Sequence, residues 1–232
     1  MDKYLYAQFE PTQEYRDRVI EFLRHNANVE IGGYRIFDGT RTHYMQNPVE
    51  ITDFVFAAKE QEKRTGRKFE SFLEIGFSAG INNTLLNKFF EFKNLVAIDQ
   101  IDSSGTGGSA FLANLRFKNL SLVCGNSMDP ETIRKAGLLG KYDLIFIDGG
   151  HDYETVRADF SNYSGFLNPG GVIAFHDIVA RDIPGPGRFW SELKAGQGAA
   201  QFPWRFDEFV DQGNHTDYGI GMMTMDTPTA GR

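Results

Sequence analysis

Four side chains of types that bind cations or move protons follow two apolar segments of the chain. Asp148 and His151 come directly after the apolar run at residues 144–147. His176 and Asp177 come directly after the next such run along the chain. Short apolar runs of this kind are typical of strands buried on both faces of a parallel sheet. Since ligands bind at the carboxyl ends of such strands, we expect the four side chains to meet at one edge of the sheet, where chemistry would occur.

A glycine-rich turn follows another predicted strand, at residues 71–76, and leads into a helix at residues 81–90. Glycines in such a turn let the backbone bend sharply and approach a ligand closely. The turn departs from the dinucleotide-binding pattern G-x-G-x-x-G, because Ser78 occupies the position of the second glycine. A pyrophosphate would find less room over Ser78.

Two further strand ends carry polar residues. Asp99 ends the predicted strand at residues 95–99, where an acid can accept hydrogen bonds from both hydroxyls of a ribose. Asn126 and Ser127 follow the predicted strand at residues 120–124 and could contact the edge of an adenine. The order of these signals at three successive strand ends is more informative than any one of them.

Together these motifs resemble the class I S-adenosylmethionine-dependent methyltransferases. The resemblance is carried by EIGFSAG at 74–80, AID at 97–99, GNS at 125–127 and PGG at 169–171. IDGGHDYETVRADF at 147–160 and LNPGGVIAFHDI at 167–178 resemble the family-24 type, which is related to metal-dependent sugar and antibiotic O-methyltransferases. The resemblance implies S-adenosylmethionine as the cofactor, bound by Glu74, Gly76, Ser78, Gly80, Asp99, Asn126, Ser127 and Asp148.

The resemblance also implies a divalent cation. In related metal-dependent enzymes an acid ends the fourth strand and a polar pair ends the fifth, and the matching positions here are Asp148, His176 and Asp177. Mg²⁺ fits such a site, because it keeps several bound waters and needs only one or two protein carboxylates as ligands. The cation would also lower the pKa of a bound hydroxyl. His151 lies where such enzymes can carry a general base. His176 departs from the usual acid and favours softer metals, so its alternative role is to orient Asp177 or contact the substrate.

Strand–helix alternation from residue 69 onward predicts an α/β fold. We expect a Rossmann-like, doubly wound, seven-stranded and mostly parallel sheet with helices on both faces, with the late antiparallel strand implied by the resemblance. Residues 69–232 would form the methyltransferase domain. Residues 1–68 carry none of the resemblance and would form a helical and loop extension that acts as a lid or an oligomer contact.

Local patterns predict further elements. Asn47 is the expected cap of a helix that starts at Pro48. The other expected features are helices at 11–26, 48–62, 129–136 and 189–194, a mobile Gly/Ser linker at 103–109, a turn at 168–171, a Pro/Gly loop at 181–188 and late strands at 204–210 and 218–224.

Several side chains have plain structural interpretations. Cys124, the single cysteine, is expected to be buried and inert. Asp152 would cap a helix, and Asp159 would be a solvated residue on that helix. Trp190 and Trp204 are expected in the core.

The 232-residue chain has a net charge of −7, which argues against nucleic acid as the main partner. It contains no apolar run of about 18 residues, so no membrane span is expected. The N-terminal residues lack a secretory signal pattern, and the default location is cytoplasmic. The Phe-rich extension could pack on a second copy, which leaves a homo-oligomer open.

The leading functional prediction is methyl transfer to a hydroxyl of a small molecule, such as a sugar or another natural product. Three alternatives remain at this point. One is a metal-independent methyltransferase of the same fold. Another is a nicotinamide-dependent oxidoreductase on a doubly wound sheet. The third is a binding protein that keeps the cofactor pocket without turnover.

Overall fold

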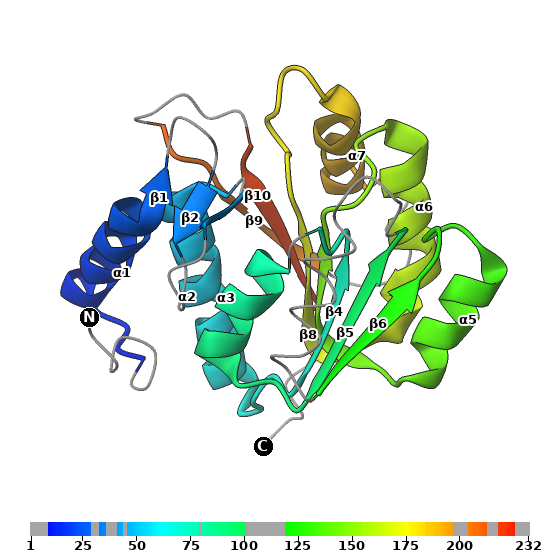
Figure 1. The fold of residues 1–232 in the computed structure, drawn as a ribbon, viewed down its shortest axis with the longest axis horizontal. Coiled ribbons are helices and arrows are strands. Elements are labelled where there is room, and N and C mark those ends of the chain that lie inside the picture. Colours follow the sequence, from blue (N-terminus) through cyan, green and yellow to red (C-terminus); the bar gives the residue numbers. More distant parts are fainter. Residues whose placement is uncertain are drawn as a thin grey trace.

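A seven-stranded sheet forms the centre of the computed structural model (Figure 1). The structure describes residues 9–28, 33–35, 41–43, 46–78, 80–100, 119–196, 204–212 and 218–225. In spatial order β6-β5-β4-β7-β8-β10-β9, the sheet is parallel except that β10 is antiparallel to both neighbours. The strands are β4 (Ser71–Ile75), β5 (Asn94–Asp99), β6 (Leu120–Cys124), β7 (Tyr142–Ile147), β8 (Leu167–Phe175), β9 (Trp204–Phe209) and β10 (Ile220–Met225). The predicted fold class is confirmed.

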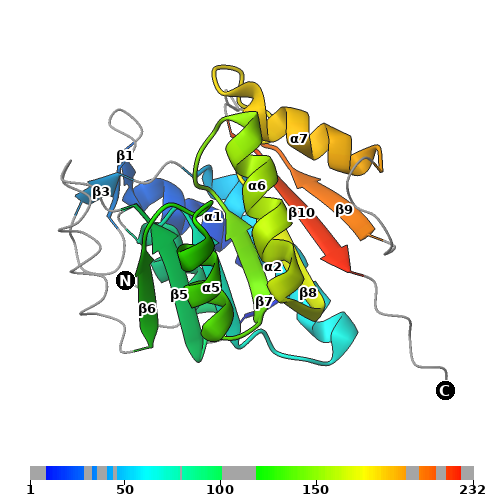
Figure 2. The same ribbon diagram turned by 90° about the vertical axis from the view of Figure 1, so that its right-hand side faces the viewer.

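Helices cover both faces of the sheet, as Figures 1 and 2 show. One face carries α1 (Gln13–Asn26), α2 (Pro48–Thr65) and α3 (Ile81–Phe90), and the other carries α5 (Pro130–Leu138), α6 (Tyr153–Tyr163) and α7 (Pro184–Lys194). Alternate residues of a strand point to opposite faces. Thus Phe72 and Phe146 join the core under α2 and α3, whereas Leu73 and Ile145 join the core under α6 and α7.

Helix α2 begins as its sequence predicts. The Asn47 side chain accepts the backbone N–H groups of Val49 at 2.8 Å and Glu50 at 3.4 Å, and Pro48 occupies the first helical position. The helix runs to Thr65, a little beyond the expected end, and stops at Gly66 in a left-handed conformation (φ 66°).

The described part of the N-terminal extension packs on the sheet. Phe54 and Val55 of α2 share one hydrophobic cluster with Phe146 of β7 and Val172 of β8. A separate antiparallel sheet contains β1 (Ala27–Asn28), β2 (Gly33–Arg35) and β3 (Arg41–His43).

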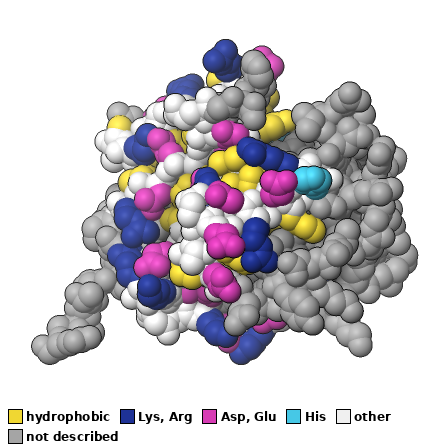
Figure 3. Space-filling model, turned by 90° about the vertical axis from the view of Figure 1, so that its left-hand side faces the viewer, with side chains coloured by type: hydrophobic (Ala, Val, Ile, Leu, Met, Phe, Trp, Pro, Cys, Tyr) yellow, Lys and Arg dark blue, Asp and Glu magenta, His cyan; other side chains and the backbone are white. Residues whose placement is uncertain are grey.

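Figure 3 shows a face of the molecule on which acidic and basic side chains are interspersed with hydrophobic ones. The division of the chain at residue 68 stays a prediction. The role of residues 1–68 as a lid or oligomer contact also stays a prediction.

The predicted turn at residues 168–171 is wrong, because these residues form the irregular start of β8. The pairing of β7 with β8 shifts register between Tyr142 and Leu144. A Cβ atom on Gly171 would lie 2.7 Å from the backbone oxygen of Asp143, so the glycine allows two strand backbones to approach.

The predicted loop at residues 181–188 is also wrong in part, because α7 begins at Pro184. Proline is favoured in the first turn of a helix. A Cβ atom on Gly185 would lie 2.3 Å from the backbone oxygen of His151. This glycine therefore serves close packing of α7 on the segment that carries His151.

Three other expectations have definite outcomes. Cys124 is exposed rather than buried, because it ends the edge strand β6. Trp190 is buried as expected, whereas Trp204 is half-buried. The linker at 103–109 lies outside the described residues. Within the described ranges, no helix combines the length and apolar character needed to cross a membrane.

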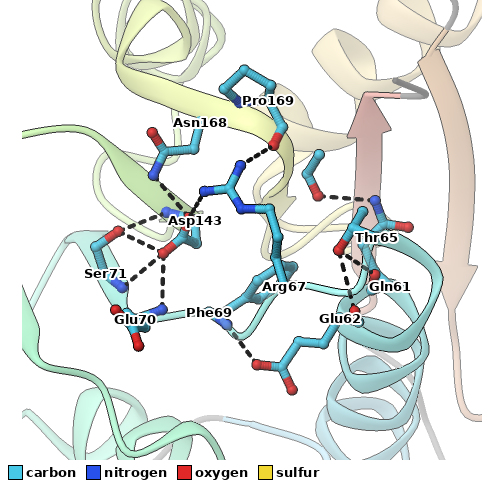
Figure 4. Close-up of polar contacts among 11 residues, drawn as sticks. Gln61, Glu62, Thr65, Arg67, Phe69, Glu70, Ser71, Asp143, Asn168 and Pro169 are labelled. Atoms are coloured by element: carbon cyan, nitrogen blue, oxygen red, sulfur yellow. Dashed lines mark hydrogen bonds and ion pairs between the residues drawn. The ribbon is translucent and has the colours of Figure 1, made fainter. Parts of the chain in front are cut away.

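Asp143 joins the amino ends of three strands, as the close-up in Figure 4 shows. Its Oδ2 atom accepts the backbone N–H groups of Glu70 at 2.8 Å and Ser71 at 3.0 Å, and the Ser71 hydroxyl at 2.8 Å. Its Oδ1 atom accepts the Asn168 side-chain amide at 2.8 Å. This buried carboxylate therefore fixes the starts of β4, β7 and β8 relative to one another.

We expect Asp143→Ala to lower the free energy of unfolding by about 2–4 kcal/mol, because it leaves several buried donors without an acceptor. Urea denaturation near neutral pH would measure the change. The control is Asp207→Ala, since Asp207 pairs with Arg205 at 3.0 Å on the surface, where an ion pair contributes less than about 1 kcal/mol. Equal losses in the two variants would contradict the anchoring role of Asp143.

Candidate active site

The four polar residues that follow β7 and β8 form one connected cluster. The Nδ1 atom of His176 lies 3.2 Å from Oδ1 of Asp148 and 3.1 Å from Oδ1 of Asp177. The Nε2 atom of His151 lies 3.2 Å from Oδ2 of Asp177. The parallel register of β7 and β8 brings their carboxyl ends side by side, which is why residues 26 positions or more apart in sequence meet here.

His176 is a buried imidazole between two carboxylates. Burial by itself would lower the pKa of His176, but the charges and hydrogen bonds of Asp148 and Asp177 raise it to about 10. The ring therefore carries a positive charge at neutral pH and offsets part of the negative charge of its neighbours. On its other side the ring stacks on Tyr218, with 5.5 Å between ring centroids and an angle of 20° between the planes.

Asp177 adopts a backbone conformation that is unusual for a residue with a side chain. Its φ angle is 62°, in the left-handed region, where Asp is more readily accommodated than bulky residues. The backbone after Asp177 is held by two hydrogen bonds. The Ile178 N–H donates to the Gly219 oxygen at 3.3 Å, and the Val179 N–H donates to the Tyr218 oxygen at 2.9 Å. Strained conformations of this kind persist where the surrounding structure fixes them, often at functional sites.

Asp148, His151 and Asp177 have the chemistry of a cation site. Each residue offers one ligand atom, and these atoms lie within 4.8 Å of one another. Two carboxylates and an imidazole suit a divalent cation. The sequence predicted His176 as the third ligand, but this group contains His151 instead. The Nδ1 atom of His176 already faces both carboxylates. The ligand roles of all these residues stay predictions.

A cavity of about 500 Å³ lies beside this cluster at the carboxyl ends of the parallel strands. Six residues that the sequence predicted to bind the cofactor line it, namely Gly76, Ser78, Asp99, Asn126, Ser127 and Asp148. His151 also lines it. The predicted cofactor wall and the predicted catalytic residue therefore face one cavity.

The glycine-rich turn is held in place by Asp99. The Oδ2 atom of Asp99 accepts the backbone N–H groups of Phe77 at 2.9 Å and Ser78 at 2.8 Å. Gly76 has a φ angle of 89°, and a Cβ atom there would lie 1.9 Å from the backbone oxygen of Asp148. Only glycine fits at this point, where the end of β4 meets the end of β7.

Glu74 and Gly80 lie at the two ends of the glycine-rich segment, and neither residue lines the cavity. Glu74 is buried, and its Oε1 atom accepts the Asn82 side-chain amide at 2.8 Å. Burial raises the pKa of Glu74 well above its usual value, which Asn82 partly offsets, and the neighbouring Asp148 and Asp99 raise it further. Gly80 has a φ angle of 71° at the start of α3. Direct cofactor contacts of both residues stay predictions.

Three residues near the cluster were not among the predicted site residues. Gln46 donates its side-chain amide to Oδ2 of Asp148 at 3.3 Å. Glu50 is a buried acid of α2, and Tyr218 covers His176. Glu50 lies outside the motifs, and an acid in the first turn of a helix is usually explained by the helix dipole, so no local signal marked Glu50.

Asp159 was predicted to be solvated, and this is wrong. It lies on the face of α6 that packs against the sheet, and none of its surface is exposed. Burial raises the pKa of Asp159 to about 6, which Ser127 partly offsets and Asp152 reinforces. Asp152 caps α6 as predicted, since its Oδ1 atom accepts the Thr155 N–H at 3.0 Å.

The buried Asp159 generates a pH-dependent prediction. Its pKa is higher in the folded protein than in the unfolded chain, so its ionisation costs stability as the pH rises toward and above about 6. We expect Asp159→Asn to stabilise the protein by about 1–2 kcal/mol more at about pH 8 than at about pH 5. Urea denaturation at both pH values measures this difference. The exposed Asp182→Asn variant is the control, and a gain independent of pH in Asp159→Asn would contradict the prediction.

Comparison of the sequence with known proteins identifies a domain family. Residues 73–178 match the family described as a methyltransferase domain. A segment of 82 residues is 39% identical to an uncharacterised protein of Sinorhizobium fredii, and it covers 35% of this chain but only 8% of that protein. An uncharacterised protein of Acanthamoeba polyphaga mimivirus is 26% identical over 156 residues, which are 63% of this chain and 69% of that protein.

Solved structures of methyltransferases share the fold. The O-methyltransferase from Bacillus cereus in complex with SAH superimposes with a TM-score of 0.58 at 16% identity, over 97% of this chain and 96% of that one. The N-methyltransferase NodS from Bradyrhizobium japonicum gives 0.52 at 20% identity, over 78% and 99% of the two chains. The MycE methyltransferase of the mycinamycin biosynthetic pathway, in complex with Mg and SAH, gives 0.52 at 16% identity, over 82% and 52%.

The sheet order, the cavity at the carboxyl ends of the parallel strands and the family match agree with one another. Residues 73–178 therefore form a methyltransferase domain, and the chain has the fold of the class I S-adenosylmethionine-dependent methyltransferases.

Proposed function

We propose that the protein transfers the methyl group of S-adenosylmethionine to a hydroxyl oxygen of a small molecule, such as a sugar or another natural product. The observation that carries this proposal is the pairing of His151 with Asp177 at 3.2 Å beside the cavity. His151 lines the cavity and its side chain is 45% exposed, so it can reach an acceptor there. A histidine oriented by a carboxylate is a recurrent arrangement for a general base.

The cavity wall supports a specific orientation of the cofactor. Asp99, which ends β5, would accept hydrogen bonds from the ribose hydroxyls. Asn126 and Ser127 would contact the adenine, and the backbone near Gly76 and Ser78 would lie against the remainder of the cofactor. In this orientation the reactive end would face Asp148 and His151, which line the same cavity.

The side chains would act mainly by placing the reacting partners. S-adenosylmethionine supplies the methyl group, which leaves the sulfonium as the acceptor oxygen attacks in line. His151 would take the proton of the acceptor hydroxyl at Nδ1, while Asp177, which contacts Nε2, would hold the imidazole in place and stabilise its charged form. Holding two bound partners in a reactive geometry can account for a large share of the rate enhancement.

A divalent cation, with Mg²⁺ as the expected one, would be held by Asp148 and Asp177. It would lower the pKa of the acceptor hydroxyl. The distances among Asp148, His151 and Asp177 support this site, and the similar fold of a methyltransferase solved with Mg and SAH is consistent with it. The contacts of His176 with both carboxylates support an orienting role for this residue in place of the predicted ligation.

A metal-independent methyltransferase is the second candidate. It is favoured by the position of His176, whose Nδ1 atom contacts both carboxylates and so balances part of their charge without a cation. Methyl transfer that persists after exhaustive chelation would support this candidate, and loss of transfer that Mg²⁺ restores would support the cation. The family match favours methyl transfer over the nicotinamide-dependent alternative.

Several finer features are also proposals. NodS, whose fold is similar, is an N-methyltransferase. The compounds tested as methyl acceptors should therefore include amines as well as sugars, phenols and polyketide-like alcohols. Methylation of amines alone would overturn oxygen as the acceptor atom. Binding of the cofactor without methylation of any acceptor would favour a binding protein. The cytoplasmic location, the lack of a nucleic acid or membrane partner and a homo-oligomer stay predictions.

We expect Asp99→Ala to weaken binding of S-adenosylhomocysteine at least tenfold, or about 1.4 kcal/mol. The variant would lose the ribose contacts and release the Phe77 and Ser78 N–H groups. Isothermal titration calorimetry measures the affinity. Asp129→Ala is the matched control, since Asp129 is exposed and lies outside the cavity lining. An unchanged affinity in Asp99→Ala would remove this residue from the cofactor site.

We expect His151→Ala to slow methyl transfer about 100-fold in single-turnover experiments, because the general base is lost. Its affinity for S-adenosylhomocysteine should stay within about threefold of the wild type, less than 1 kcal/mol. His25→Ala is the control, since His25 is exposed on α1. An unchanged single-turnover rate in His151→Ala, measured with one of the methyl acceptors tested, would exclude His151 as the base.

A further inference from the structure

Glu50 is a buried acid whose two oxygens serve two distant parts of the backbone. Only 1% of its surface is exposed. Its Oε1 atom accepts the Asp211 N–H at 3.0 Å, and its Oε2 atom accepts the Gly219 N–H at 2.9 Å. Asp211 follows β9 and Gly219 precedes β10, so one carboxylate on α2 fixes the positions where these two strands end and begin.

Gly219 lies at a tight junction. Its φ angle is 76°, and a Cβ atom there would lie 2.9 Å from Cγ2 of Val179 and 3.0 Å from Cγ1 of Ile178. The oxygen of Gly219 also accepts the Ile178 N–H at 3.3 Å. The segment held by Glu50 is therefore packed directly on the residues that follow Asp177.

Tyr218 links the segment held by Glu50 to His176 of the polar cluster. Its backbone oxygen accepts the Val179 N–H at 2.9 Å, and its ring stacks on His176 with 5.5 Å between centroids. Among the hydrogen bonds described, Glu50 therefore makes none to a cluster residue, but it holds Gly219, the neighbour of Tyr218, and its charge interacts with that of His176.

We propose that Glu50 is a positioning residue of the active site, which fixes Gly219 and Tyr218 and thereby holds His176 and the chain after Asp177. This inference rests on the proposed function and extends it to the N-terminal extension, which carries none of the methyltransferase motifs. A carboxylate with a merely structural role would affect the stability of the protein without altering the surroundings of His176.

Histidine imidazole signals in nuclear magnetic resonance spectra provide a readout that a purely structural role would not move. The experiment uses histidine-labelled full-length protein saturated with S-adenosylhomocysteine. Loss of one signal in His176→Asn assigns His176 among the five histidines. Tyr218→Leu then defines how the signal moves when the stacked ring is absent.

We expect Glu50→Gln to move the His176 signal toward its position in Tyr218→Leu. The amide of glutamine can accept only one of the two N–H groups that the carboxylate accepts. Glu62→Gln is the matched control on the same helix, since Glu62 also accepts a backbone N–H, that of Phe69 at 2.6 Å. Glu62 lies about 18 Å farther along α2, so its replacement should leave the His176 signal in place.

An unchanged His176 signal in folded Glu50→Gln would overturn the proposal. If this variant does not fold, Gly219→Ala disturbs the same contact from the other side, and an unchanged signal there would overturn it equally.

Binding measurements separate this proposal from the proposed function. We expect Glu50→Gln to weaken Mn²⁺ binding about tenfold, as replacements behind metal ligands commonly do, and to leave S-adenosylhomocysteine binding within about twofold. Failure of the wild type to bind Mn²⁺ would count against the cation of the proposed function, and the His176 signal would still decide the role of Glu50. Unchanged Mn²⁺ binding in Glu50→Gln, with a wild type that binds Mn²⁺, would contradict the proposal.

Discussion

Two carboxylates in one small, mostly buried space repel each other unless they share a proton or positive charge lies near both. At the ends of β7 and β8 the His176 imidazolium supplies this charge, with its Nδ1 atom 3.2 Å from Asp148 and 3.1 Å from Asp177. This arrangement leaves Oδ2 of Asp177 to contact His151 at 3.2 Å. The geometry of the cavity edge therefore depends on where His176 is held.

The site is held from two sides. On the side of the predicted cofactor site, Asp99 accepts hydrogen bonds from the backbone of the glycine-rich turn, and Gly76 allows β4 to approach β7 closely. On the opposite side, Gln46, which precedes α2, contacts Asp148, and Glu50 of α2 contacts Gly219. A site preorganised in this way can align donor and acceptor without rearrangement during the reaction.

Much of the fold and part of the site could be predicted from the sequence, because strand ends are local features. The apolar runs stop at Asp148 and His176, and parallel pairing then brings these ends together. The contacts of Glu50 could not be predicted, since its partners lie 161 and 169 residues away. Asp159 was misjudged because sequence alone did not reveal which face of α6 packs on the sheet, and residues 184–188 were misjudged because their prolines and glycines also suit a closely packed helix start.

We propose that one cavity binds the methyl donor next to a cation held by Asp148 and Asp177. A crystal structure of the protein with S-adenosylhomocysteine and Mn²⁺ tests it most directly, because anomalous scattering locates the metal. The account predicts the ribose on Asp99, the sulfur facing His151 and a Mn²⁺ peak between the two carboxylates. S-adenosylhomocysteine bound elsewhere would contradict the cofactor site, and a cofactor-bound cluster that takes up no Mn²⁺ would contradict the cation.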